Sequence, residues 1–423
     1  MSTLKDQNKQ YLSDVFKIST AIEDGSRIFE FKNPNEKLII YDPGLIHTAI
    51  CKTSISRIDL DNGRFYYRGY PVTEWVKRDF LDIALLLLNE KLCGTEEKHV
   101  FYDSIDKYFV LYPEIQSTLD TLPENIHPTD YLSVGFLSLG ALSSKCLGPK
   151  SNPLEEAAFM IAQGAIITAY YYVSHSHGHW EEPLTKGSYA FRIAKCMHPL
   201  EDDTRIEKLA KILNVMMILH AEHGQNCSTA VVRLVESAHG PLYNAIASGI
   251  AAFKGFLHGG ASQFVSEMYD EILTNNYDID AYIDKKIANK EPLLGFGQRT
   301  YNRILNGLDP RVETMRKILF ADDFDFPEVE PYKQIALKMI DRVSNDPYFK
   351  KRNITANPDL FNCILFKLFK VPSAMNPVMI CLSRVMGWTA NYYEQKRDSK
   401  LLIRPCDLQK SYLQELEDIY NTY

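Results

Sequence analysis

From about residue 75 onward, apolar residues recur at intervals of three and four positions along most of the chain. That spacing puts apolar side chains on one face of an α-helix. It predicts helices over residues 79–90, 206–219, 331–343 and 372–388. Strands and helices do not alternate, and neither G-x-G-x-x-G nor G-x-x-x-x-G-K-[ST] occurs, which argues against a doubly wound nucleotide-binding sheet. The pattern therefore predicts a mainly α-helical fold.

One short segment near the N-terminus has a different period. In residues 54–67 (SISRIDLDNGRFYY), Ile58 precedes and Phe65 and Tyr67 follow an Asp-Asn-Gly turn, with apolar and polar residues alternating on both sides. Alternation around such a turn is typical of a β-hairpin. We therefore expect a small β element ahead of the helices.

Composition limits the classes of function. The chain has 423 residues, 45% of them apolar and 24% charged, and a net charge of −7. These proportions are those of a folded globular protein with more than one domain. The acidic balance argues against binding to nucleic acid, which needs a basic face, but it leaves room for an anionic small molecule in a local pocket.

Eight scattered cysteines without a C-x-x-C motif predict reduced thiols and a cytoplasmic location. The polar N-terminus contains no secretory signal pattern. Residues 157–173 carry no charge, which is at the lower edge for a membrane span. Since this stretch contains Gln163, Gly164 and Thr168, we interpret it as a buried core helix and expect no membrane association.

Two histidine segments interrupt apolar surroundings. His220 and His223 in LHAEHGQN end the long predicted helix and, being three residues apart, are expected on one helical face. They fit a metal pair, buried or capping histidines, or hydrogen bonding to a substrate; no third metal ligand is evident. His258 in GFLHGGAS is flanked by glycines, which fits either a close approach of backbone or ligand or an ordinary turn at a helix end.

Two further segments combine turns with charge. In LLGFGQRTYNRILNGLDPR, the Gly-Phe-Gly turn presents Gln298, and Asp-Pro precedes Arg311; a solvent loop is the alternative. Asp359 follows Asn-Pro at a predicted helix start, where capping the helix is the default role. Arg384 lies inside the apolar PVMICLSRVMGW and needs a partner, for which a carboxylate ligand is one option, and Arg404 in LLIRP is a further candidate.

A separate triple, His175, His177 and His179, has the alternation of an extended segment. A polar loop explains it better than a metal site does.

Taken in order, these segments resemble the citrate synthase family. The similarity begins at YDPGLIHTAICKTSISRIDLDNGRFYYRGYP (residues 41–71) and continues through LHAEHGQNCST, GFLHGGAS, LLGFGQRTY, LDPR, NDPYF, NPDLF and SRVMGW…LLIRP. The resemblance implies a two-domain helical fold: an N-terminal lead (1–40) containing a small β region, a large domain (41–266 plus 374–423) and a small domain (267–373). The lead resembles that of hexameric, Gram-negative-type enzymes. The family resemblance also implies a homodimer as the minimal unit, with a hexamer as an alternative.

The family's reaction condenses acetyl-CoA with oxaloacetate, an anionic 2-oxo dicarboxylate. It needs a carboxylate base, a donor for the enolate oxygen, and cations for the dicarboxylate. The resemblance implies no metal and no tightly bound cofactor, with acetyl-CoA as co-substrate. By its motifs, Asp359 is the base, His258 the enolate-side donor, His223 a ligand of the oxo acid with His220 nearby, and Arg311, Arg384 and the partner chain's Arg404 the clamp, while the CoA adenine is held by Leu293, Leu294, Gly295, Phe296 and Gly297.

Three departures from the family pattern qualify this assignment. Gln298 stands where the family has a histidine that donates to the ketone; a carboxamide still donates a hydrogen bond but supplies no proton. The stretch NRILNGL ahead of Arg311 is longer than usual. Glu222-His223-Gly224 replaces Asp-His-Glu.

The sequence thus leaves three hypotheses. The first is a citrate synthase, with Asp359, His258 and the arginines retained. The second is a related enzyme with an altered acceptor or acyl-CoA, such as a 2-methylcitrate synthase or a condensing enzyme of specialised metabolism. The third is a non-catalytic protein that binds CoA or a dicarboxylate.

Overall fold

The computed structural model describes residues 16–18, 29–32, 38–42, 44–45, 48–59, 62–148, 151–176, 178–183, 186–297 and 309–405. The chain divides into two compact units, Met1–Lys52 with Leu401–Tyr423, and Thr53–Lys400. The first unit contains an antiparallel sheet in the order β1 (Phe16–Ile18), β2 (Phe29–Lys32), β3 (Leu38–Tyr41). The division into large and small helical domains at residues 267 and 373 stays a prediction.

The second unit begins with the predicted hairpin. Strands β4 (Ser56–Asp59) and β5 (Arg64–Tyr67) pair antiparallel, and the short β6 (Tyr70–Pro71) pairs with β5. Gly63 has a φ of +58°, which a glycine in the turn adopts without strain. Phe65 and Tyr67 are both buried, as the alternation predicted.

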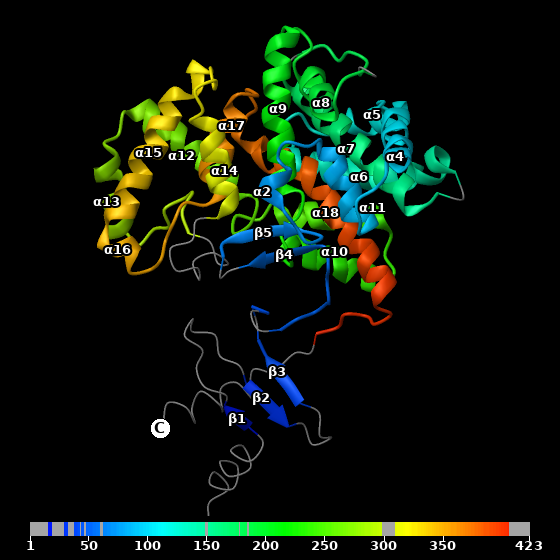
Figure 1. Cartoon of the computed structure of the whole chain (residues 1–423), viewed down its shortest axis with the longest axis horizontal. Coiled ribbons are helices and arrows are strands. Elements are labelled where there is room, and N and C mark those ends of the chain that lie inside the picture. Colours follow the sequence, from blue (N-terminus) through cyan, green and yellow to red (C-terminus); the bar gives the residue numbers. More distant parts are fainter. Residues whose placement is uncertain are drawn as a thin grey trace, which may run out of the picture. The chain divides into compact units, whose positions relative to one another are not determined.

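The rest of the described part of this unit is helical, which confirms the predicted fold class (Figure 1). The helices, in chain order, are α2 (Val72–Trp75), α3 (Phe80–Asn89), α4 (Thr95–Tyr108), α5 (Pro113–Leu119), α6 (Pro128–Leu147), α7 (Pro153–His175), α8 (Tyr189–Met197), α9 (Asp203–His220), α10 (Cys227–Ser237), α11 (Leu242–Phe253), α12 (Ala261–Asn275), α13 (Ile279–Ala288), α14 (Pro310–Leu319), η2 (Pro327–Val329), α15 (Glu330–Asn345), α16 (Pro347–Lys350), α17 (Pro358–Lys367), η3 (Ser373–Met375) and α18 (Asn376–Asp398).

The four helices predicted from periodicity are all present. Helix α3 starts after Asp79, whose carboxylate accepts the Leu81 N–H at 2.8 Å, and ends before Glu90, which has a left-handed backbone. Helices α9 and α15 extend a few residues beyond their predicted ranges. Helix α18 starts later than predicted because the residues just before it form the 3-10 turn η3.

Helix α7 confirms the predicted core helix. By length and composition alone it could span a membrane, but 89% of its most apolar window is buried inside the protein. Gln163, in its middle, donates to the backbone carbonyls of Tyr108 and Val110 at 2.7 and 2.8 Å. A buried amide is tolerated when its donor group is paired in this way.

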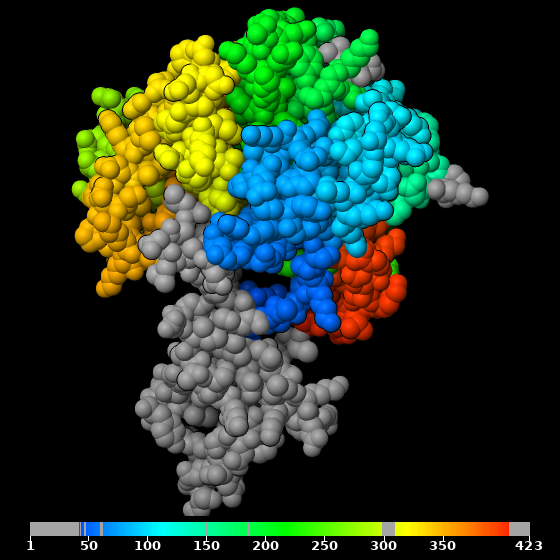
Figure 2. All heavy atoms as spheres, in the orientation of Figure 1, coloured from blue at the N-terminus to red at the C-terminus, as the bar shows by residue number. Residues whose placement is uncertain are grey.

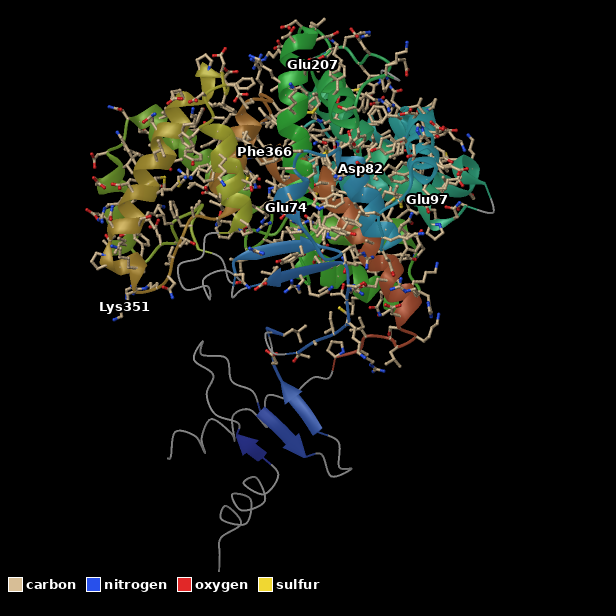
Figure 3. The ribbon with its side chains drawn as sticks, viewed as in Figure 1. Glu74, Asp82, Glu97, Glu207, Lys351 and Phe366 are labelled. Atoms are coloured by element: carbon tan, nitrogen blue, oxygen red, sulfur yellow. The ribbon has the colours of Figure 1, made fainter. Side chains whose placement is uncertain are left out.

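Helix α18 is the centre of the unit. Residues 376–392 are all buried, and the helix packs against α7, α9, α10 and α11 (Figure 1). A helix buried on every side must be apolar all round, so each polar side chain in it needs a partner. Helices α12 to α17 pack on one another, and α14 (yellow) lies beside α2 (blue) and α9 (green) in Figure 2. Phe366 of α17 is buried, whereas Glu207 lies on the exposed face of α9 (Figure 3).

The contact between α18 and the end of α9 depends on Gly387. Its N–H donates to the Ala221 carbonyl at 3.1 Å, and an added Cβ would lie 2.2 Å from that oxygen and 2.6 Å from Glu222 Oε2. We therefore expect Gly387→Ala to lower the free energy of unfolding by about 1–3 kcal/mol, measured by urea denaturation. Gly94→Ala is the control, since a Cβ there has no neighbour nearer than 4.0 Å. Equal free energies of unfolding for the two variants would mean that α18 and the end of α9 can move apart at little cost to accommodate the added Cβ.

Candidate active site

A cavity of about 450 Å³ brings together most of the residues singled out in the sequence. From the predicted set its lining contains His220, His223, His258, Leu293, Leu294, Gly295, Phe296, Gly297, Arg311, Asp359 and Arg384. The lining comes from the ends of helices α9, α14 and α17, the middle of α18, and two glycine-rich connections. Segments more than 150 residues apart in the chain thus meet at one place.

The end of α9 is held by groups from other elements. The last helical residue is His220, whose carbonyl accepts the Arg384 Nε–H at 2.7 Å. The hydroxyl of Tyr67 lies 2.9 Å from the Ile218 carbonyl and 3.2 Å from the Glu222 N–H, while the Ala221 carbonyl accepts from Gly387. Because these partners satisfy the groups that another turn of helix would use, α9 stops there. The expectation that His220 and His223 share a helical face is therefore wrong, although both still line the cavity.

Arg384 is a buried cation in α18, with 4% of the residue exposed. Burial lowers its pKa, and the negative charge of Glu222 is the largest influence opposing that fall. Glu222 is also buried; it accepts from Ser56 Oγ at 3.2 Å and from Asn391 Nδ2 at 3.1 Å. Burial raises the pKa of Glu222, while Arg384 is the largest influence opposing that rise. The partner that the sequence demanded for Arg384 is thus a backbone carbonyl together with a nearby carboxylate.

Arg311, in the first turn of α14, is paired with Asp309. Its Nε lies 3.1 and 3.2 Å from the two Asp309 oxygens, and its Nη2 lies 2.6 Å from Oδ2. Asp309 also accepts the Arg311 backbone N–H at 3.0 Å, which caps the helix. Both side chains are buried. The predicted turn therefore holds the guanidinium in place at the cavity rather than presenting it to solvent.

Asp359 is the second residue of α17 and does not cap the helix. The cap is Asn357, whose Oδ1 accepts the Asp359 N–H at 3.0 Å, so the default capping role expected for Asp359 is wrong. With that role taken by Asn357, the Asp359 carboxylate faces the cavity. Burial raises the pKa of Asp359 to about 6, although Arg311 and Asn362 both act to lower it. A carboxylate with that pKa is a stronger base than an exposed one and is still ionised at neutral pH.

The raised pKa predicts how activity depends on pH. If Asp359 must be ionised to act as a base, kcat/KM rises tenfold per pH unit below about pH 6 and levels off above it. The profile should be measured with the intact enzyme over pH 5 to 8. An unshifted profile, flat down to pH 4.5, would contradict the raised pKa of Asp359.

His258 lies in the connection between α11 and α12, which its glycines allow to fold tightly. A Cβ at Gly259 would lie 2.1 Å from the Phe253 ring, and one at Gly260 would lie 2.2 Å from the Lys254 carbonyl. The expectation of a close approach at these glycines is confirmed, and the approach is to the chain itself.

The proton position on His258 follows from its neighbours. Its Nε2 accepts the Ser228 backbone N–H at 3.4 Å and lies 2.9 Å from Ser228 Oγ. A backbone N–H only donates, so Nε2 is unprotonated and Nδ1 carries the hydrogen. Burial, followed by the charge of Arg384, lowers the pKa of His258 to about 4. His258 is thus a neutral hydrogen-bond donor through Nδ1 at physiological pH.

The other two histidines of the cavity are also neutral. Burial, then Arg311 and Arg384, hold the pKa of both His220 and His223 well below the ordinary value. His220 Nε2 lies 2.8 Å from Asn362 Oδ1, and the His223 ring packs edge-on against Phe65 with centroids 5.2 Å apart. Neutral histidines can donate hydrogen bonds to an anion without adding charge.

The Gly-Phe-Gly turn is docked on the start of α17 and is not a solvent loop. Gly295 and Gly297 have φ of +80° and +81°, the Gly297 N–H donates to the Thr355 carbonyl at 2.8 Å, and the Asn357 N–H donates to the Gly295 carbonyl at 2.9 Å. The turn predicted from the glycines is confirmed, and Asn357 joins it to the helix that carries Asp359.

Gln298 and Arg404 complete the predicted set. Gln298, with the long stretch after it, lies outside the described residues. Arg404 belongs to the first compact unit, where it is exposed, while the cavity belongs to the second.

The metal alternatives receive no support within the described ranges. No group of three or more His, Cys, Asp or Glu side chains in that part of the chain could hold a metal ion. His177 of the separate triple lies outside it, and His175 stacks on Tyr171 with ring centroids 4.0 Å apart.

Sequence reasoning missed Ser228 and Asn362, which touch the histidines of the cavity. Ser228 is in the first turn of α10 and also accepts from Trp388 Nε1 at 3.2 Å. Asn362 follows Asp359 by one helical turn and is fully buried. The signal for Ser228 was the Asn that caps the start of α10, and the signal for Asn362 was its place one turn after Asp359. Each pattern is also common in helices that carry no functional site.

Comparisons with known proteins bear on the family of the chain. The sequence profile of the family described as "Citrate synthase, C-terminal domain" matches residues 44–406. Citrate synthase 1 of Mycobacterium tuberculosis is 31% identical over 376 residues, which is 85% of each chain. Citrate synthase of Corynebacterium glutamicum is 30% identical over 377 residues, 85% of this chain and 83% of the relative.

Two solved structures share the fold. Citrate synthase from Thermotoga maritima aligns with a TM-score of 0.74 and 30% identity over 86% of this chain and 94% of its own. Citrate synthase from Thermoplasma acidophilum, solved as a ternary complex with carboxymethyl coenzyme A and oxaloacetate, aligns with a TM-score of 0.78 and 25% identity over 87% and 95%.

Proposed function

Because this chain belongs to the citrate synthase family, a family of condensing acyltransferases, we propose that it joins acetyl-CoA to oxaloacetate and releases citrate and CoA. The observation that carries the proposal is the pairing of Asp359 with His258 in one cavity. One is a carboxylate with a raised pKa, and the other is a neutral donor whose free hydrogen is on Nδ1. Taking a proton from a thioester methyl requires both kinds of group.

In this mechanism the Asp359 carboxylate removes a methyl proton, and His258 Nδ1–H donates to the thioester oxygen as negative charge develops there. The nucleophilic carbon then attacks the ketone carbon of oxaloacetate, whose oxygen takes up a proton from solvent to become the hydroxyl of citrate. Water cleaves the thioester, which gives the third carboxylate of citrate and releases CoA. The neutral state of His258 suits this role. Its Nδ1–H is already in place to donate a hydrogen bond to the oxygen on which the negative charge of the enolate develops.

Oxaloacetate would be held by the arginines and histidines of the same cavity. Arg384 and Arg311 supply the positive charge, and His223 supplies a neutral donor, whereas the single N–H of neutral His220 is donated to Asn362 Oδ1. Each arginine has a carboxylate of its own, Glu222 for Arg384 and Asp309 for Arg311, which helps to hold it in position before the substrate binds. Fixed cations that need no reorganisation favour a dicarboxylate strongly.

A second candidate is condensation with a different 2-oxo acid or acyl-CoA. It is favoured by Gln298 in place of the family's histidine and by the longer stretch before Arg311. A non-catalytic binding protein is the third.

Thiol release separates the three candidates. Acetyl-CoA and propionyl-CoA are each incubated with oxaloacetate and with a panel of other 2-oxo acids, and free CoA is measured. The proposal predicts the highest kcat/KM for acetyl-CoA with oxaloacetate. A higher value for another pair favours the altered enzyme, and no release with any pair, despite dicarboxylate binding, favours the binding protein.

We also propose that Arg404 acts in the site of a partner subunit, as the resemblance implies. Arg404→Ala and Arg384→Ala are each expected to abolish activity, whereas a refolded mixture should recover roughly a quarter of the wild-type rate. The reason is that half of the random dimers are hybrids, each with one intact site. No recovery in a mixture that light scattering shows to be dimeric would place Arg404 in its own subunit's site, and full activity of Arg404→Ala alone would place it outside any site.

A further inference from the structure

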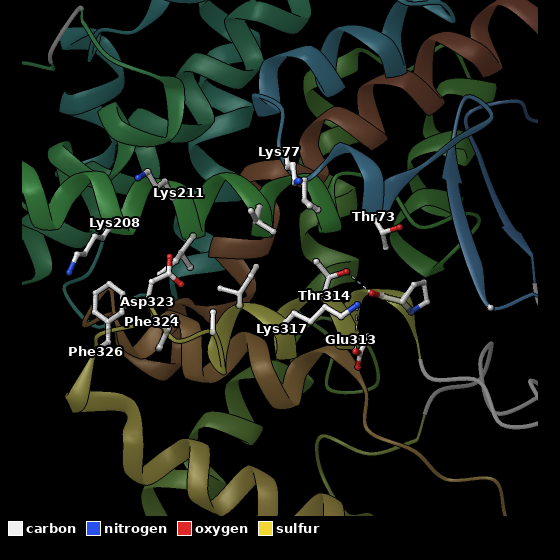
Figure 4. Close-up of a pocket in the computed structure, with 17 residues that line it drawn as sticks. Thr73, Lys77, Lys208, Lys211, Glu313, Thr314, Lys317, Asp323, Phe324 and Phe326 are labelled. Carbon is white, nitrogen blue, oxygen red and sulfur yellow. Dashed lines mark hydrogen bonds and ion pairs between the residues drawn. The ribbon is translucent and has the colours of Figure 1, made fainter.

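A second groove, of about 1030 Å³, shares no lining residue with the candidate active site (Figure 4). One wall is the turn after α2 together with the exposed side of α9. The other wall is α14 with the segment leading to Phe326. Lys211 precedes His220 by nine residues of α9, and Lys317 follows Arg311 by six residues of α14, so the groove is about 9–14 Å along these helices from the site.

The rim of the groove is basic. Lys77, Lys208 and Lys211 lie on one wall and Lys317 on the other, against two acidic residues, Glu313 and Asp323 (Figure 4). Lys317 lies 3.7 Å from Glu313, which also pairs with Arg316.

Three of these lysines have no carboxylate within ion-pair distance among the described residues. They are Lys77, Lys208 and Lys211, and all three are exposed. A concentration of positive charge is unusual on a chain with a net charge of −7, and it raises the local concentration of anions.

The floor of the groove is apolar. Val76 and Val215 contribute from the first wall, Ile318 from the second, and the rings of Phe324 and Phe326 close one end. Val76, Val215, Ile318 and Phe324 are half-buried, so apolar surface remains open to a ligand. A small inorganic anion would leave this surface uncovered, whereas an aromatic or acyl group would bury it at about 25 cal/mol per Å².

We propose that this groove binds an amphipathic organic anion, with an aromatic or acyl body against the apolar floor and a phosphate or similar dianion on the lysines. Lys77 and Lys211 hold the anionic group, and Phe324 and Ile318 contact the body. The proposal is independent of the proposed function, since it needs neither acyl-CoA nor a 2-oxo acid.

The test is isothermal titration of the full chain with 1-naphthyl phosphate, which combines an aromatic body with a dianion. We expect one molecule bound per chain, with at least tenfold weaker binding of inorganic phosphate and of the neutral 1-naphthylmethanol. Lys77→Glu/Lys211→Glu should weaken the binding of 1-naphthyl phosphate at least tenfold. The control is Lys285→Glu/Lys351→Glu, which reverses two exposed lysines elsewhere and should leave binding unchanged.

Three results would overturn the proposal. The first is no binding of 1-naphthyl phosphate at millimolar concentration, and the second is equal affinity in both double variants. The third is loss of binding in Arg384→Met, which would put the probe in the candidate active site. Thermal denaturation of each variant confirms that it is folded, and because no turnover is measured, failure of the proposed function would leave these outcomes intact.

Discussion

Replacing Asp359 with asparagine is expected to lower the kcat of condensation by about 10²–10⁴-fold, the usual contribution of a general base. Asparagine has nearly the same shape but accepts no proton. Affinity for oxaloacetate, measured by titration calorimetry, should stay within a few-fold of wild type, because the arginines and histidines that hold it are unchanged. Asp278→Asn, at the cap of α13, is a matched control that should leave kcat intact. Retained turnover in Asp359→Asn would remove Asp359 from the role of base.

The same substitution should stabilise the fold. In the folded chain the pKa of Asp359 is raised from 3.8 to about 6, so the folded state binds its proton more tightly than the unfolded state does. The free energy of unfolding therefore falls as pH rises from about 4 to about 6 and remains lower above that range. At pH 7 asparagine avoids this cost, and we expect a gain of up to about 3 kcal/mol in urea denaturation. A lower stability than wild type would mean that the carboxylate is better compensated than its burial indicates.

Replacing Arg384 with methionine is expected to have the second large effect. Removing one member of a buried charge interaction typically costs about 2–5 kcal/mol, or roughly 30–5000-fold in affinity for the dicarboxylate. The variant also leaves Glu222 buried without its nearest positive charge and frees the His220 carbonyl. We therefore expect Arg384→Met to lose both oxo-acid binding and stability.

A double variant separates these two losses. Arg384→Met/Glu222→Gln removes the uncompensated carboxylate, so its free energy of unfolding should recover towards wild type, while its affinity for oxaloacetate should not. Glu222→Gln alone is the reference for the cycle. If the affinity for oxaloacetate recovered together with the free energy of unfolding, Arg384 would stabilise the fold without binding the substrate.

The features of the site that could be predicted from sequence are those with a local cause. The glycines after His258 predicted a close approach, and the structure contains it because a Cβ at Gly259 or Gly260 would clash with the preceding segment. The Gly-Phe-Gly segment predicted a turn, which Gly295 and Gly297 make with φ of +80° and +81°. The isolated Arg384 in an apolar helix demanded a partner, and it has one. Helical periodicity located α3, α9 and α15 because each presents an apolar face to the core, and it located α18, which is apolar on most sides because it is buried all round.

The features that could not be predicted arise from contacts between distant segments. Helix α9 ends at His220 because Tyr67, Arg384 and Gly387 satisfy its last carbonyls, and no local signal marks that end. The hydrogen on His258 is placed by the Ser228 N–H, which lies 30 residues earlier in the chain. Capping was the default role for Asp359, and it failed because Asn357, two residues earlier, is an equally suitable cap and occupies that position.

Proton exchange at the acetyl-CoA methyl group tests the central claim most directly. The enzyme is incubated in D2O with acetyl-CoA and malate, a 2-hydroxy analogue of oxaloacetate that has no ketone to attack, and deuterium in the methyl group is followed by mass spectrometry. The account predicts exchange in the wild type, and no exchange above the uncatalysed rate in Asp359→Asn. Exchange at the wild-type rate in Asp359→Asn would contradict the assignment of Asp359 and His258 as the groups that activate the thioester.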